Sequence, residues 1–458
     1  MSRLADSISA SVARTGAPAF WHLWRLDRRM ARKLTAGGWL IVGLAAASAV
    51  FGLNTTETLI YQVFGIAVSL LLVAAIASAR LGARMAITRR LPSVATAGTV
   101  FGYTLSIRNV GRRAATSLEV QEVLGTERPA AIDFIAHKVH EDRERNLFDR
   151  LVGYPRWVSL MRMRLGARPP EARVETVAPG ETISLALECV PLRRGVLRFD
   201  AVSLGRVEPL GLMRALRRVA LPETLLVMPR TYPAATLTLP GARRLQPGGV
   251  AFAGRVGDAE EFMSLRDYRP GDTPRRIHWK AWARSGRPVV KEYQDEFFVR
   301  HALLLDTFSP PDAAAFEAAV SLAASLVMNP GSKDSLLDLM FVEQRAYTLT
   351  RGRGVGEATE LLRVLASVTP SRGKFEELAE AALLGATRMS GALCVLLEWD
   401  KPRRDLVAAL RGRGIPIRVW VVRAEAGTAA LDPGPMASDA GNFRVVVPSR
   451  LAQELSRP

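Results

Sequence analysis

The residues that could do chemistry gather in one stretch, positions 257–292. Asp267, Asp272 and His278 follow one another closely there. Two carboxylates and an imidazole can bind a metal ion and activate a water molecule, which is the chemistry of a metal-assisted hydrolase. The same side chains can also hold a turn together or contact a partner protein, so the three residues alone leave an enzyme and a non-enzyme open.

A tight turn and a short helix must position these residues. The run Arg269-Pro270-Gly271-Asp272 is typical of a turn, because proline presets φ and glycine accepts a positive φ. Thr273 followed by Pro274 predicts the start of a helix. Gly286 predicts its end about three turns later, and an extended segment is expected to follow.

The charges of this stretch balance. Residues 257–296 contain six Arg and two Lys against eight Asp and Glu, inside a chain of net charge +18. A surface built for phosphates would not carry matching acids, so the pattern indicates ion pairs packed among Trp279, Trp282 and Tyr293. We expect a clasp that ties two domains together, with a partner-docking surface or a catalytic cluster as alternatives. The candidate interaction residues are Arg266, Asp267, Tyr268, Arg269, Pro270, Gly271, Asp272, Arg275, Arg276, His278, Trp279, Lys280, Arg284, Lys291 and Glu292.

Other catalytic and cofactor motifs are missing from the sequence. Cys189 and Cys394 are the two cysteines, and neither CxxC nor HExxH occurs, so we expect no disulfide framework and no structural metal site. The glycine-rich run at 351–356 lacks the GKT ending of a nucleotide loop and is interpreted as a turn. No cofactor is therefore predicted.

The first 36 residues are basic and amphipathic. Phe20-Trp21-His22-Leu23-Trp24 precedes five basic residues between positions 25 and 33. We interpret this segment as lying on a membrane surface with its tryptophans at the level of the headgroups. A mobile tail is the alternative.

Two uncharged apolar runs follow, residues 37–53 and 58–79. The second, at ~1.5 Å per residue, is long enough to cross the ~30 Å hydrocarbon core. With four residues between them, the runs predict a transmembrane helical hairpin at 37–84. The rival, a signal peptide cleaved near Ala47-Ser48-Ala49, has an unusually long basic region before it and a second span behind it.

Nearly half of the positive charge belongs to this region. Residues 1–90 contain ten Arg and one Lys against three acidic residues. By the positive-inside rule both ends of the hairpin face the cytoplasm and residues 54–57 face outward, which predicts a multi-pass membrane protein with its soluble domains in the cytoplasm. The same placement explains the charge better than nucleic-acid binding does.

From residue 85 the hydrophobic pattern alternates with period two. Short strands between turn signals, such as Asn109-Val110-Gly111 and Pro179-Gly180, predict an immunoglobulin-like β-sandwich over residues 85–230. Residues 124–172 interrupt it with helical spacing. This insertion is expected to cover the sandwich, with the membrane or a partner as alternative contacts.

Residues 231–299 contain a connector rich in Pro and Gly and then the charged stretch described above. Residues 300–458 alternate apolar strands with helices. Near-continuous apolar strands predict a parallel sheet buried on both faces, and so a doubly wound α/β domain.

The sequence also resembles a known family. The run EEFMSLRDYRPGDTPRRIHWKAWARSGRPVVKEY is similar to the signature of the domain-of-unknown-function 58 family. The resemblance continues upstream in RRGVLRF (193–199) and EPLGL (208–212), and downstream in LLLD (303–306) and FEAAV (316–320). It implies a membrane-anchored protein with a von Willebrand factor A-like domain and a MoxR-type AAA ATPase partner. No reaction is established for the family.

Domains of the von Willebrand A type often bind Mg²⁺ through D-x-S-x-S after the first strand, since hydroxyl and carboxylate oxygens suit a hard cation. The matching run is Asp306-Thr307-Phe308-Ser309-Pro310, in which Phe308 and Pro310 replace both serines. Asp306 is thus a weak metal candidate. We therefore expect a non-enzymatic, membrane-anchored adaptor, with a hydrolase using Asp267, Asp272 and His278 as the alternative.

Overall fold

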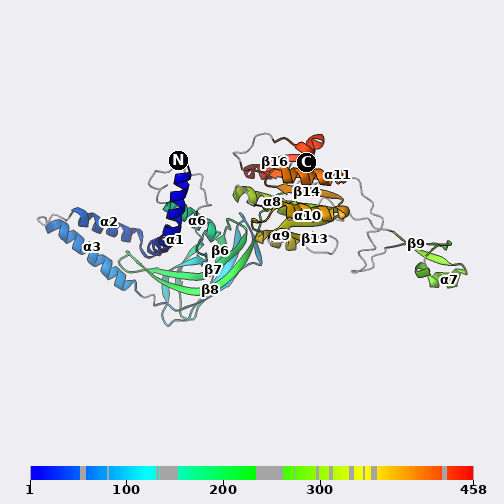
Figure 1. Cartoon of the computed structure of the whole chain (residues 1–458). Helices are drawn as coiled ribbons and strands as arrows, with labels where there is room; N and C mark the ends of the chain where they lie inside the picture. The colour runs from blue at the N-terminus through cyan, green and yellow to red at the C-terminus, as the bar shows by residue number, and fades with distance from the viewer. Residues whose placement is uncertain are drawn as a thin grey trace. The chain divides into compact units, whose positions relative to one another are not determined.

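The computed structural model describes residues 2–51, 58–79, 82–129, 134, 153–233, 261–272, 274–294, 299–308, 313–329, 335–343, 346–351, 358–424 and 431–456. The chain divides into two units, Met1–Arg230 and Thr231–Pro458 (Figure 1), and each is described by itself. The predicted 54–57 loop, the glycine-rich run after Arg351 and most of the connector lie outside the described residues.

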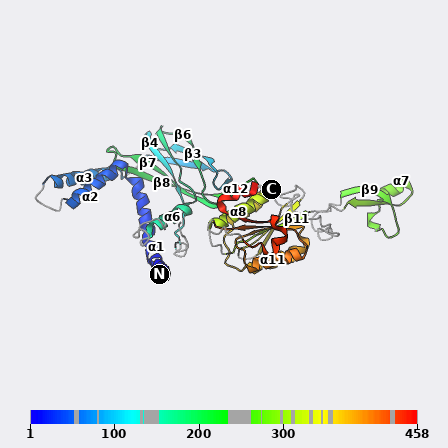
Figure 2. The same cartoon turned by 90° about the horizontal axis from the view of Figure 1, so that it is seen from above.

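Three helices open the first unit: α1 (Ser2–Lys33), α2 (Ala36–Phe51) and α3 (Thr58–Ala77). Figures 1 and 2 show α2 and α3 side by side. Within α3, residues Ile60–Ala77 are long and apolar enough to cross a membrane, and 11% of that stretch is buried inside the protein. The 16 residues of α2 are apolar but shorter.

Helix α1 packs on protein through part of its aromatic face, which differs from the membrane-surface interpretation. Phe20 and Trp24 are each 8% exposed and belong to the core of the first unit. The Phe20 ring lies 6.0 Å from that of Trp157 in helix α6 (Tyr154–Leu165). The expectation that Trp24 sits among headgroups is therefore wrong. An amphipathic face can be buried by protein or by lipid, and sequence spacing is the same in both cases.

Two sheets form a β-sandwich around that core. One has the order β1 (Met85–Arg90), β3 (Phe101–Asn109), β6 (Thr182–Cys189). The other has the order β2 (Val94–Thr96), β8 (Arg214–Met228), β7 (Gly195–Val207), β4 (Ala115–Leu124), β5 (Glu171–Val177). Inward residues of both sheets, such as Leu105 and Leu204, are fully buried. The Pro179-Gly180 turn, with Gly180 at φ 81°, carries the chain from one sheet to the other.

Of the predicted insertion, the structure describes residues 125–129, 134 and 153–170. Helix α6 places Trp157, Leu160, Met161 and Leu165 in the core shared with the strands. The described part of the insertion thus covers the sandwich, as expected.

The second unit contains a six-stranded sheet of order β13 (Ala346–Arg351), β12 (Ser335–Val342), β11 (Val299–Leu305), β14 (Gly391–Leu396), β15 (Ile417–Val422), β16 (Phe443–Val446). Only β13 runs antiparallel among these strands. Leu303 and Leu305 pack on one face, and Ala302 and Leu304 on the other. Both faces are apolar because both are covered.

Helices cover the two faces of this sheet (Figure 2). On one face lie α8 (Ala313–Met328), α9 (Ala358–Ser367) and α12 (Leu451–Ser456). On the other lie α10 (Phe375–Gly385) and α11 (Lys401–Gly412). Short 3₁₀ segments complete the unit at η3 (Ala386–Arg388), η5 (Gly434–Asn442) and η6 (Pro448–Arg450). This is the doubly wound architecture that the apolar strands predicted.

A turn of the sandwich docks onto the start of the apolar helices. Between β7 and β8, Glu208 accepts hydrogen bonds from the backbone N–H groups of Leu210, Leu212 and Met213. Burial alone would raise the pKa of Glu208, but these three donors leave it lowered. Within this turn, the Leu212 carbonyl accepts a hydrogen bond from the backbone N–H of Thr35 at 3.0 Å. This is the EPLGL run of the family resemblance.

Candidate functional site

The signature segment forms a small hairpin with a helical turn between its strands. Strand β9 (Glu261–Asp267) pairs antiparallel with β10 (Val289–Gln294). Between them lie η2 (Pro274–Arg276) and α7 (Trp279–Ser285). The sequence predicted one continuous helix. It is divided because Ile277 forms a β-bridge with Val290 and His278 becomes the N-cap of α7. Gly286 ends α7 at φ 67°, as predicted, whereas Thr273 lies outside the described residues.

Asp272 holds the turn of this hairpin. Its carboxylate accepts two hydrogen bonds from Arg266, Nη1 to Oδ2 at 2.8 Å and Nη2 to Oδ1 at 2.7 Å. It also accepts the backbone N–H of Arg269 at 2.8 Å. The hydrogen bonds from Arg266, and then that from Arg269, lower the pKa of Asp272 to about 2. This bidentate pair spans six positions and fixes the direction of the chain between Asp267 and η2.

His278 has a comparable structural task. Its Nδ1 accepts the backbone N–H of Ala281 at 2.9 Å, and its own backbone N–H donates to Val289. The Nδ1 lone pair is thus used by the helix cap. Asp272 and His278 are thus both engaged in holding the hairpin, while Asp267 is exposed. Within the part of the chain that the structure describes, no group of three His, Cys, Asp or Glu side chains could hold a metal ion.

The remaining signature residues lie mostly on the surface. Exposed residues are Asp267, Tyr268, Arg269, Pro270, Gly271, Arg275, Trp279, Lys280 and Arg284, while Lys291 is half-buried. The side chains of Arg276 and Glu292 lie outside the described residues. Trp279 is 63% exposed and stacks on Trp282 with ring centroids 5.3 Å apart. The Arg266–Asp272 pair lies within one turn, so the clasp between domains stays a prediction.

A second candidate lies at the carboxyl edge of the α/β sheet. The strand order reverses between β11 and β14, which is where open α/β sheets bind their ligands. Asp306 follows β11 there and is fully buried. Its Oδ1 accepts the backbone N–H of Phe308 at 3.1 Å, and its Oδ2 accepts the backbone N–H of Leu397 at 3.0 Å.

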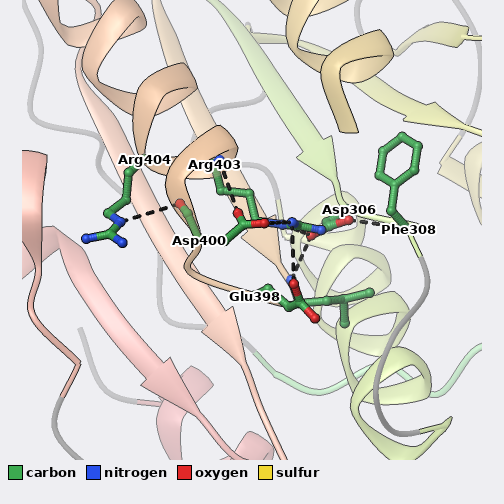
Figure 3. Close-up of polar contacts among 7 residues, drawn as sticks. Asp306, Phe308, Glu398, Asp400, Arg403 and Arg404 are labelled. Atoms are coloured by element: carbon green, nitrogen blue, oxygen red, sulfur yellow. Dashed lines mark hydrogen bonds and ion pairs between the residues drawn. The ribbon is translucent and has the colours of Figure 1, made fainter. Parts of the chain in front are cut away.

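Arg403 of α11 supplies the positive charge at this edge (Figure 3). Its Nε donates to Asp306 Oδ2 at 2.7 Å and its Nη1 to Asp400 Oδ2 at 2.7 Å. Glu398 approaches Nη1 at 3.7 Å, and the guanidinium lies 4.6 Å from the Phe375 ring centroid. Burial alone would lower the pKa of Arg403, but Asp306 and then Asp400 raise it above its ordinary value.

The site therefore does not fit a divalent cation. The Asp306 oxygens are occupied by two backbone donors and one guanidinium. The Thr307 hydroxyl donates to the Val342 carbonyl, which turns it toward the backbone, and Ser309 lies outside the described residues. Asp306 fixes the loop and Arg403 together, and the weak metal assignment is not supported.

The sequence analysis missed Arg403 and Asp400. The signal was present in Asp400-Lys401-Pro402, which follows a buried strand and is typical of a helix start. Asp400 is the N-cap of α11 and accepts the backbone N–H of Arg403 at 3.3 Å. Arg403 lies 97 positions after Asp306, and sequence spacing alone does not bring the two side chains together.

The fold and the two sites define a class of protein. It has an apolar helix of membrane length, a β-sandwich, and a doubly wound domain whose carboxyl edge carries a buried arginine paired with an aspartate. Residues 264–412 match the model of the family described as "Protein of unknown function DUF58", as the resemblance predicted. The match runs from the signature hairpin through α11 and includes both sites.

One relative is the "Uncharacterized protein YeaD" of Bacillus subtilis (strain 168). It is 31% identical over 148 residues, which are 32% of this chain and 35% of the relative. The chain thus spans about a third of that relative's length.

Solved structures with partial similarity include three of different kinds. Proximal thread matrix protein 1 from the mussel byssus is 14% identical over 34% of this chain and 44% of its own, with a TM-score of 0.27. The CARDB domain of the PF1109 protein from Pyrococcus furiosus is 12% identical over 32% of this chain and 93% of its own, with a TM-score of 0.17. An aerotolerance-related membrane protein from Bacteroides fragilis is 13% identical over 34% of this chain and 95% of its own, with a TM-score of 0.23. The fold described above rests on the strand orders themselves.

Proposed function

We propose that this protein is a membrane-anchored, non-enzymatic adaptor of the bacterial inner membrane. It presents an immunoglobulin-like sandwich and a von Willebrand A-like domain to the cytoplasm. There it works with a MoxR-type AAA ATPase on a client protein. One observation carries this proposal: both places where the sequence offered chemistry are closed by the chain's own ion pairs, Arg266–Asp272 and Arg403–Asp306.

Membrane anchoring is supported by the first three helices. The stretch Ile60–Ala77 of α3 is apolar and mostly unburied within the protein. Helix α2 packs beside it, and basic residues flank the pair on both sides. The charge bias favours cytoplasmic ends for both helices.

The anchoring proposal is tested with single cysteines. Thr56→Cys should react with a membrane-impermeant maleimide added to intact cells, whereas Arg112→Cys should react only after lysis. The native Cys189 and Cys394 are buried and give little background. The reverse labelling pattern would place the two large units outside the cytoplasm and remove the cytoplasmic ATPase from consideration.

The docking surface proposed for the partner centres on Trp279. This side chain is 63% exposed although its ring is held by stacking on Trp282. Exposed, rigid tryptophans surrounded by arginines are typical of binding hot spots. Arg275, Lys280 and Arg284 lie exposed on the same short segment and offer charges to an acidic partner.

A pull-down of the full chain from membranes tests this surface. The wild type should recover the AAA ATPase in ATP, in ADP or in both. Trp279→Ala should reduce the recovery about tenfold or more, as removal of a hot spot does. Leu384→Ala is the matched control, since it removes an apolar side chain that is 82% exposed on α10. Recovery of no AAA ATPase under either nucleotide, or full recovery with Trp279→Ala, contradicts the proposal.

A further inference from the structure

A groove of about 740 Å³ lies between α1 and the sandwich, within the first unit. Its polar lining is dominated by arginines: Arg25, Arg28, Arg29 and Arg32 come from α1, and Arg218 comes from β8. Asp200 of β7 is the acidic residue of the lining. Five arginines thus line the groove against one carboxylate. Of these, Arg28 and Arg32 are half-buried, and the other three are exposed.

Within the part of the chain that the structure describes, acidic side chains match only part of the charge of this groove. Asp200 approaches Arg218 at 3.7 Å. Among the described residues, Arg28 and Arg32 form no ion pair. Burial, and then the nearby charges of Arg28 and Arg218, lower the pKa of Arg32 to about 10. Burial also lowers the pKa of Arg28.

Elsewhere in the same unit, buried arginines are paired. Arg89 is buried and meets Glu122 at 2.7 Å, with both side chains inaccessible to water. Arg214 meets Glu119 at 2.7 Å. These two guanidiniums of the sandwich are thus paired with carboxylates, whereas Arg28 and Arg32 in the groove form no ion pair among the described residues. An uncompensated, partly buried charge cluster is stabilised by an anion from outside.

The arginines of the groove are also held in place. The Arg28 guanidinium lies 5.0 Å from the centroid of the Trp24 ring, and Trp24 stacks on Trp21 at 5.5 Å. Trp24 itself is anchored in the core. A planar guanidinium fixed in this way presents its N–H donors in the geometry that phosphate oxygens accept.

The groove lies next to the start of the apolar helices. Arg32 precedes Ala36, the first residue of α2, by four positions, and Arg28 precedes it by eight. Helix α1 ends at Lys33 and α2 begins at Ala36, so Arg32 lies beside the junction of the two helices and Arg28 about one helical turn before it. Arginines that flank an apolar helix in this way are within reach of lipid headgroups when that helix spans a membrane.

We propose that this groove binds the phosphate of an anionic phospholipid headgroup. Arg28 and Arg32 donate to the phosphate oxygens, and the lipid's negative charge neutralises the two guanidiniums, which have no ion pair among the described residues. A zwitterionic headgroup carries its own cation and neutralises the cluster less well. The site rests on the membrane anchoring proposed above, and it gives the anchor a preference for lipid composition.

Lipid titration of the full chain in a neutral detergent tests the site. The thermal midpoint is measured as phosphatidylglycerol, phosphatidylcholine or inorganic phosphate is added. Phosphatidylglycerol should raise the thermal midpoint with a saturating dependence on its concentration, because a ligand that binds the folded state stabilises it. Phosphatidylcholine and inorganic phosphate should need at least about tenfold higher concentration for the same shift.

The variant Arg28→Gln/Arg32→Gln should weaken phosphatidylglycerol binding by about tenfold for each arginine removed. Arg112→Gln/Arg113→Gln is the matched control and should bind as the wild type does. It removes two exposed arginines from the turn after β3. That turn is also near the apolar helices in the chain, since the Val110 N–H donates to the carbonyl of Arg84, which follows α3. Arg28→Lys/Arg32→Lys retains the charge and should bind with intermediate affinity, which covers the case in which the glutamine variant does not fold.

A structural role for the two arginines predicts a different result. Without lipid, the glutamine variant should be as stable as the wild type or more stable, since it removes two half-buried like charges. A lower lipid-free midpoint with unchanged lipid affinity would overturn the proposal, as would equal binding by all variants. Binding of inorganic phosphate as tightly as phosphatidylglycerol would assign the groove to free phosphate. If the chain were instead recovered from the soluble fraction, membrane anchoring itself would fail.

Discussion

Replacing Arg403 by methionine leaves Asp306 without its guanidinium. Asp306 is fully buried, and it would keep the backbone donors of Phe308 and Leu397 but lose the charged partner at 2.7 Å. Breaking a buried ion pair in this way costs on the order of 3–5 kcal/mol. Asp400 adds little to the loss because its side chain is 40% exposed and regains water. The two remaining donors place the expected cost at the lower end, about 3 kcal/mol.

The two cysteines allow this cost to be measured in the intact chain. Cys394 lies in β14 and is fully buried, and burial raises its pKa to about 12. Cys189 is buried in the sandwich of the other unit. A buried thiol reacts with a labelling reagent when its unit opens, so the labelling rate follows the free energy of opening. Each ~1.4 kcal/mol is a factor of ten, and Arg403→Met should raise Cys394 labelling roughly 10²-fold.

Two controls accompany this measurement. Arg404→Met removes the neighbouring arginine, whose Nε donates weakly to the Asp400 carbonyl at 3.4 Å, and should leave labelling within about threefold. Asp306→Asn/Arg403→Met leaves no stranded carboxylate and should label more slowly than Arg403→Met alone. A change below about threefold for Arg403→Met, or a parallel rise at Cys189, would refute the reasoning.

Three further predictions follow from other parts of the structure. Gly38→Ala would place a Cβ 2.1 Å from the Leu212 carbonyl oxygen, so it should destabilise the docked turn by about 1–3 kcal/mol. The measurement is the thermal midpoint in detergent, which should fall. Gly43→Ala is the control and should leave the midpoint unchanged, because no atom lies within 4 Å of its Cβ position. The lowered pKa of Asp272 means that its stabilisation is complete above about pH 4 and is lost as the pH falls through about 2; pepsin cleavage within residues 266–272 should rise over that window, and Asp272→Asn should abolish the change. EDTA and excess Mg²⁺ should both leave Cys394 labelling unchanged, since Arg403 is the cation at the sheet edge.

The elements of the α/β unit could be predicted because their strands are apolar on both faces. Leu303-Leu304-Leu305 in β11 is the clearest example, with neighbouring residues facing opposite cores. The edge strand β13 was missed, since Ala346–Arg351 alternates Tyr and Leu with Thr and is covered less fully. The three residues of β2 were too short for any periodic signal.

The sites were less predictable for a physical reason. The pairing of Asp306 with Arg403 joins residues 97 positions apart, and only the order of the strands brings them together. The Arg266–Asp272 pair is local, and both residues are among the candidates from the sequence, but composition alone does not say which arginine pairs with which carboxylate. The groove of Arg28 and Arg32 forms because α1 packs on the sandwich. The spacing of apolar residues in α1 would be the same if α1 packed on lipid, so the groove could not be predicted from the sequence.

Strand β8 has a mechanical consequence. It begins at Arg214, whose guanidinium donates to the Leu34 carbonyl at 2.9 Å, and it ends at Met228, two residues before the second unit starts. Fifteen residues at ~3.3 Å each make a rod of roughly 50 Å. It is paired with β7 along nearly all of that length. A pull on the second unit directed along this rod loads these hydrogen bonds together, in shear, rather than one after another. Force would therefore reach the membrane helices at the Thr35 junction before the sandwich unzips.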